Sequence, residues 1–210
     1  MTDTIIDYLR KRVVIYAIVV SILALGMAAG GIAVGVMDAG SRSELAEFLG
    51  GYVDQLASGA GALGLTSTPI SLEALRGAGI PWLLGLTVIG GPVVLALAFL
   101  RGFALGFTLV FLFERLSYKS ILLAFVGILP HAMFTIPGAI LACGSAIAFS
   151  LAAAKILAGR RDEGPVLGHF IVSSVLSGAA AILIVIGAWV QANLSPILVQ
   201  TIARYVSFSL

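Results

Sequence analysis

Charged residues are scarce in this chain, and this scarcity limits where it can fold. Only 10% of the 210 residues are charged, whereas 60% are hydrophobic. Soluble domains carry about 25% charged residues, because their surface must face water. The composition therefore excludes a soluble domain and predicts one all-α domain embedded in the lipid bilayer of the cell membrane. The net charge of +2 is too small and too scattered to indicate nucleic-acid binding.

The chain also lacks the residue patterns of common active sites. Its single cysteine, Cys143, excludes an intrachain disulfide and is expected to pack as a small apolar residue. The sequence has no carboxylate pair, nucleophile elbow, phosphate-binding loop or metal-ligand spacing. We therefore expect no enzymatic activity, no cofactor and no metal.

A long apolar run follows Arg10, Lys11 and Arg12, close to the N-terminus. It extends from Val13 to Met37, which exceeds the apolar core of about 7–15 residues in a cleaved signal peptide. A helix over this run can cross a bilayer with some tilt. We expect it to be retained as the first span.

The remaining apolar segments differ in length. Three are long enough to cross unaided: Ile80–Leu100, Met133–Ala154 and Phe170–Gln191. Gly102–Phe113 gives only about 18 Å of helix and spans only if it continues to Tyr118. Ile121–Leu129 is shorter and ends at a proline, which indicates a re-entrant half-helix.

Basic residues constrain the number of crossings. The segment Arg10–Arg12 and the loop with Arg160 and Arg161 are both expected to face the cytoplasm. Four spans between them and a fifth afterwards satisfy this rule, whereas six full spans would place Arg160 and Arg161 outside. The predicted order is a span at 13–37, an extracytoplasmic loop at 38–79, three spans within 80–157 with a broken segment near 121–131, a cytoplasmic loop at 158–169, a last span at 170–191 and an extracytoplasmic tail at 192–210.

The 38–79 loop is predicted to contain an amphipathic helix. Its apolar residues recur at helical spacing, and the stripe consists of Leu45, Phe48, Leu49, Tyr52, Val53 and Leu56. Ser41 and Glu44 have the spacing of a capping box at its start. A second amphipathic helix is predicted in the tail, from Ser195 and Pro196. Each helix can either cover the bundle or bind a partner.

Few polar residues lie at membrane depth. Arg101 stands between two apolar runs, and we interpret it as an anchor at the cytoplasmic interface. Gly102 and Gly106 follow at the spacing that lets helices approach closely.

Two prolines interrupt the next segment. Pro130 and Pro137 make a continuous helix unfavourable, and His131 lies beside the first. Broken backbone at membrane depth is tolerated only inside protein or beside a water-filled cavity. We therefore expect Pro130 and His131 inside the protein, at either a substrate pathway or a packing joint. One histidine without an acidic neighbour is a weak basis for proton relay or metal binding.

Several segments resemble, in order, the stage II sporulation protein M family. They are the basic start near Arg10, the loop helix, Pro81–Val93, Leu100–Thr108, Leu129-Pro130, Ile136-Pro137, Arg160-Arg161 and Leu194-Ser195-Pro196. The resemblance covers nearly the whole chain, from about Tyr8 onwards. Relatives often carry glycine and glutamate where this chain has Ala132 and Thr135, which weakens any proton-coupled mechanism at His131.

The resemblance implies a role in endospore formation. The family's sporulation member is a multi-pass protein of the mother-cell membrane at the septum and is required for engulfment. It anchors two peptidoglycan-degrading enzymes, the stage II sporulation proteins D and P. The leading hypothesis is thus a membrane scaffold with outward-facing partner sites, for which Phe48 and Tyr52 are the favoured anchors. The alternatives are a small transporter or lipid-handling protein that uses the segment near Pro130, and an intramembrane enzyme, for which the residues are missing.

The topology can be tested with single cysteines in a Cys143→Ala background. Cysteines at Ser58 and Ser209 should react with an impermeant thiol reagent in intact cells, because both positions are predicted to lie outside. A cysteine at Gly159 should stay unlabelled until the cells are opened. Labelling at Gly159 in intact cells would exclude the five-span topology.

Overall fold

The computed structural model describes residues 12–45, 47, 72, 75–87, 89–115, 118–159 and 166–207. Its elements are the helices α2 (Val13–Val36), α5 (Ile80–Gly85), α6 (Gly90–Arg115), α7 (Tyr118–Leu157) and α8 (Val166–Ser207), with a π-helical turn η2 (Leu75–Gly79) directly before α5. The described part contains no strand, so the predicted all-α class is confirmed.

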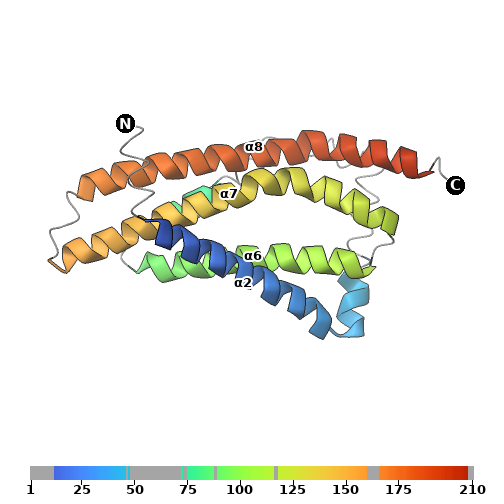
Figure 1. The fold of residues 1–210 in the computed structure, drawn as a ribbon, viewed down its shortest axis with the longest axis horizontal. Helices are drawn as coiled ribbons and strands as arrows, with labels where there is room; N and C mark the ends of the chain where they lie inside the picture. Colours follow the sequence, from blue (N-terminus) through green and yellow to red (C-terminus); the bar gives the residue numbers. More distant parts are fainter. Residues whose placement is uncertain are drawn as a thin grey trace.

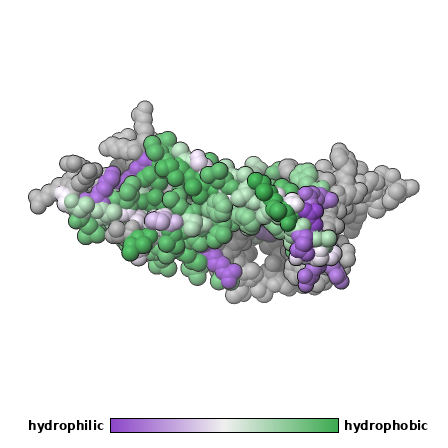
Figure 2. Space-filling model, turned by 90° about the horizontal axis from the view of Figure 1, so that it is seen from below, coloured by the Kyte–Doolittle hydropathy of each residue, from purple (hydrophilic) through white to green (hydrophobic). Residues whose placement is uncertain are grey.

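Four of these helices contain segments long and apolar enough to cross a membrane. The candidate spans are Val13–Val36, Gly90–Phe111, Leu129–Leu157 and Val166–Gln191. Many large apolar side chains on them are exposed, including Leu25, Ile32 and Ile182. Figure 2 shows hydrophobic residues over most of the visible length of the molecule, with hydrophilic residues gathered mainly toward its ends. Such a surface is compatible with lipid, and the chain is a multi-pass membrane protein.

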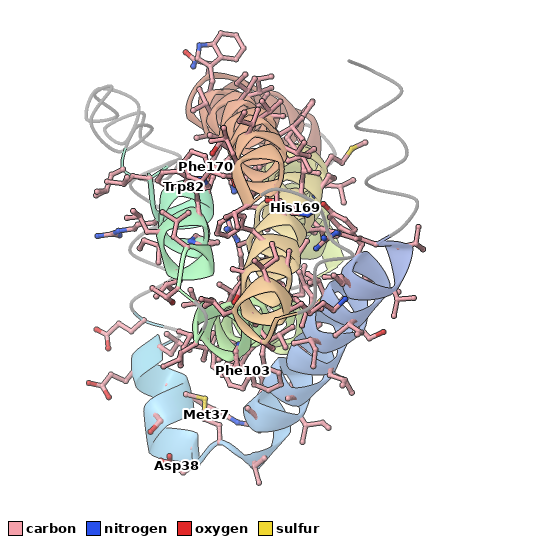
Figure 3. The ribbon with its side chains drawn as sticks, turned by 90° about the vertical axis from the view of Figure 1, so that its left-hand side faces the viewer. Met37, Asp38, Trp82, Phe103, His169 and Phe170 are labelled. Atoms are coloured by element: carbon pink, nitrogen blue, oxygen red, sulfur yellow. The ribbon has the colours of Figure 1, made fainter. Side chains whose placement is uncertain are left out.

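The long helices form a bundle in which α7 lies between α8 and the α2–α6 pair (Figure 1). Helices α2 and α6 run in the same direction, whereas α7 runs against α6, and α8 against α7. The end of α2 therefore lies at the same end of the bundle as the end of α6, the start of α7 and the end of α8. Helix α5 lies on the opposite side of the bundle from α2 (Figure 3).

Four glycines bring α2 and α6 into backbone contact. They face carbonyl oxygens of the opposite helix: Gly26 faces Phe99, Gly30 faces Phe103, Gly102 faces Leu23 and Gly106 faces Met27. A Cβ atom at any of the four would collide with that oxygen. Apolar burial does not draw helices together in lipid, so close packing of this kind is a main source of their association.

Helices α7 and α8 are joined by small and hydroxyl-bearing residues. The hydroxyls of Ser145 and Ser177 lie 3.2 Å apart, and the Ser173 hydroxyl donates to the Ser145 carbonyl at 3.2 Å. A Cβ at Gly138 would lie 2.9 Å from Ile184 Cγ1. Hydrogen bonds between membrane helices contribute about 0.6 kcal/mol on average, so packing and polar contacts together hold this pair.

The predicted break near 121–131 is wrong. Helix α7 is continuous from Tyr118 to Leu157, with Pro130 and Pro137 inside it, so Ile121–Leu129 is not a re-entrant half-helix. Each proline removes one backbone donor and bends the helix, and α7 is visibly bowed (Figure 1). Membrane helices tolerate this because neighbouring helices and Ser or Thr hydroxyls satisfy freed backbone groups. Thr135, between the two prolines, donates a hydrogen bond from its hydroxyl to the His131 carbonyl at 2.9 Å.

The interruption lies earlier in the chain. The predicted spans Ile80–Leu100 and Gly102–Tyr118 are replaced by the short helix α5 and a single helix α6 that continues through Arg101. The turn between them is held by Thr87, whose hydroxyl donates to the Leu84 carbonyl at 2.7 Å. Gly90 ends this turn where a Cβ would collide with the Leu84 carbonyl oxygen. The backbone at that point therefore excludes any larger residue.

The last helix is also longer than predicted. The expected span at 170–191 lies within α8, which continues past Pro196 to Ser207, so the tail does not begin a separate helix. Helix α7 begins at Tyr118 and α8 ends at Ser207, at the same end of the bundle. The orientation of the two ends relative to the cytoplasm stays a prediction.

The glycine contact predicts unequal effects of two alanine substitutions on α2. Gly30→Ala should lower the melting temperature in detergent, with a cost of about 1–3 kcal/mol, because its methyl group meets the backbone of α6. Gly35→Ala is the matched control, since no atom lies within 4 Å of a Cβ there. Equal melting temperatures for the two variants would contradict this packing.

Candidate functional site

The predicted partner-binding helix begins directly after α2. Residues 39–45 are helical, and we call this segment the connector helix. Leu45 is half-buried on it, whereas Phe48, Leu49 and Tyr52 lie outside the described residues.

The connector helix is capped by Asp38, not by the predicted Ser41–Glu44 box. The Asp38 carboxylate accepts a hydrogen bond from the Ser41 backbone N–H at 3.1 Å. The helix begins earlier than predicted because this aspartate follows the apolar run and can serve as its N-cap. Hydrogen bonds from the Ser41 side chain and backbone lower the pKa of Asp38. Figure 3 shows Asp38 at the connector helix, at the lower edge of the bundle in that view.

Arg42 fastens the connector helix to the bundle. Its Nη2 donates to the carbonyl oxygens of Val34 at 2.6 Å and Gly35 at 3.1 Å, in the last turn of α2. Its Nη1 lies 3.5 Å from the Glu114 carboxylate at the end of α6. One side chain thus links three helices, and it donates to two carbonyls in the last turn of α2, of which the Val34 carbonyl also accepts from the Met37 backbone N–H.

Arg101 does not lie at the end of a span, although its position in the sequence had suggested an anchor at the membrane interface. It lies midway along the candidate span Gly90–Phe111, about 15 Å of helix from either end. A Cβ at Gly77 of η2 would lie 3.2 and 3.4 Å from its two terminal nitrogens and 2.7 Å from Ile184 Cδ1. The guanidinium therefore lies in the middle part of this candidate span, beside η2 and α8, and Gly77 leaves the space that it occupies.

The residues around Pro130 are only partly enclosed. Pro130 and His131 are half-buried, whereas Pro137 is exposed. The Thr135 hydroxyl lies 3.2 Å from the His131 ring nitrogens. A Cβ at Gly187 of α8 would lie 2.7 Å from that hydroxyl. His131 therefore belongs to the α7–α8 contact, and Gly102 and Gly106 belong to the contact of α6 with α2.

Sequence reasoning missed the contacts that hold α5. Trp82 donates from Nε1 to the Ser174 hydroxyl at 3.3 Å, and its ring lies 6.1 Å from that of Phe170 (Figure 3). The Ser150 hydroxyl donates to the Thr87 carbonyl at 2.9 Å. The only sequence signal for the attachment of α5 is Trp82, which directly follows Pro81. The sequence does not identify the residues of α7 and α8 that α5 contacts.

Comparison with protein families gives a match over most of the chain. The family model described as stage II sporulation protein M matches residues 17–196. No curated protein matches the chain, and no solved structure matches it. Within the described residues, no group of three or more His, Cys, Asp and Glu side chains could hold a metal ion.

The Asp38 cap predicts an acid-sensitive start of the connector helix. Because the folded pKa of Asp38 lies below its ordinary value of 3.8, the cap stabilises the helix above that value and is lost as the pH falls through the folded pKa. Amide hydrogen exchange at Ser41, corrected for its intrinsic rate, should accelerate in that acid range. Asp38→Asn is the control, since asparagine does not titrate and should abolish the pH dependence. A wild-type protein with no acid transition at Ser41 would refute the cap.

Proposed function

Since the chain belongs to the stage II sporulation protein M family, we propose that it is a non-enzymatic membrane scaffold of the engulfment machinery. It anchors peptidoglycan-degrading enzymes of the stage II sporulation D and P type and localises them at the septal membrane. In this role the membrane bundle supplies a rigid base, and the partners bind outside the bilayer.

One observation carries this proposal. At one end of the bundle, a further helix follows the candidate span Val13–Val36 after only two residues: the connector helix. The connector helix is capped and fastened, although it is too short to be stable alone in water. A short helix held in a fixed direction outside lipid is suited to presenting a binding surface.

A second candidate function is the transport of a small anionic solute. The unbroken α7 removes the basis for a pathway at Pro130. Arg101 favours transport for a different reason, because arginine at membrane mid-depth is rare and commonly marks a substrate or ion pathway. It lies beside η2, and π-helical turns are frequent at functional sites. This reading places the activity inside the bundle, whereas the scaffold places it at the end.

Alanine substitutions separate the two functions. Phe48→Ala or Tyr52→Ala should weaken retention of the hydrolase by ~2 kcal/mol if either is a hot spot, and the protein level should stay normal. Trp189→Ala is a matched control, because this aromatic side chain is 58% exposed on a candidate span. The measurements are engulfment in sporulating cells and co-purification of the hydrolase.

The same assays on His131→Ala and Arg101→Gln complete the test. A scaffold should keep its partners in both variants, provided that the variants insert stably. Inserted variants that still bind the hydrolase but fail in engulfment would reject a pure scaffold and favour transport.

A further inference from the structure

The connector helix carries charges of both signs, and the two signs point in different directions. Asp38 at its N-cap, Glu44 on it and Glu47 two residues beyond it are exposed. Arg42 is turned inward, with its side chain 26% exposed. The positively charged side chain of Arg42 thus attaches the connector helix to the bundle.

The attachment depends on the shape of arginine. A planar guanidinium can donate to two carbonyls of α2 through one nitrogen while another nitrogen faces the Glu114 carboxylate. An ammonium group presents one compact charge and cannot reach all three acceptors in this arrangement. The bonds to carbonyls carry most of the attachment, because Glu114 is 39% exposed and half-exposed ion pairs contribute little.

We propose that Arg42, assisted by Glu114, is the positioning residue for partner binding: it fixes the direction of the connector helix relative to the bundle. This inference rests on the proposed scaffold function. The Arg42–Glu114 clasp joins the ends of α2 and α6, which the glycine contact already holds together. The connector helix is therefore held in a fixed position relative to the bundle, and a bound hydrolase is held in a defined orientation above the membrane.

The first experiment measures the clasp without any partner. A nitroxide is attached to a cysteine at Ala39, an exposed position, in a Cys143→Ala background, and its mobility is followed by electron paramagnetic resonance in lipid nanodiscs. Arg42→Gln should make the label markedly more mobile, Glu114→Gln less so, and Arg42→Lys intermediate. Lys155→Gln, the same kind of change at the other end of the bundle, should have no effect. Equal mobility in all variants would overturn the clasp.

The second experiment measures recruitment in a double-mutant cycle. Arg42→Gln should reduce co-purified hydrolase by about fivefold, which corresponds to ~1 kcal/mol, at unchanged protein level and melting temperature. Adding Glu114→Gln to it should cause no further loss, because the clasp is already open. If the double variant loses as much hydrolase as the product of the two single losses, each side chain contacts the partner independently. That result would reject the positioning role of Arg42.

The two experiments also separate the two proposals. Wild-type protein that retains no hydrolase would reject the scaffold function, and with it the role of Arg42 in recruitment. The mobility data would still decide whether the clasp exists. Wild-type retention together with an immobile label in Arg42→Gln would keep the scaffold and reject the clasp.

Discussion

The contact of α2 with α6 determines much of the remaining architecture. Gly26 and Gly30 interlock with glycines of α6, so the backbones of the two helices touch, and the helices run in the same direction. Their last turns therefore meet at one end, where Arg42 can reach both the Val34 carbonyl and the Glu114 carboxylate. Because α2 and α6 are parallel, the chain between them must return from the end of α2 to the start of α6. The elements η2 and α5 directly precede α6, and α5 lies on the opposite side of the bundle from α2.

The sequence predicted the elements whose ends are marked by charge. The first span was placed within one residue of α2, since Arg12 and Asp38 bound its apolar run. The same rule failed at Arg101, which was taken as the end of a span but lies in the middle of α6. A charge can remain at membrane depth when protein surrounds it, and that protein, Gly77 and Ile184, is distant in sequence. Pattern analysis along the chain does not contain this information.

The prolines misled the prediction for a related reason. In water, Pro130 and Pro137 would argue strongly against a single helix. In lipid, a helix is retained because every alternative exposes more unsatisfied backbone. The actual interruption, between α5 and α6, has Thr87 and Gly90 as its local markers. The candidate site shows the same division. A helix in the segment after the first span was predicted, and its described part is the connector helix, whereas the Arg42 contact with Glu114 joins residues too far apart in the chain to be predicted.

Helix length has a mechanical consequence at the end of the bundle that bears the connector helix. The start of α7 and the end of α8 lie at this end, because the two helices are antiparallel. Each turn added to or removed from a helix changes its length by about 5.4 Å. In the proposed scaffold, the number of turns would therefore set the working distance between the lipid surface and the polymer being cut.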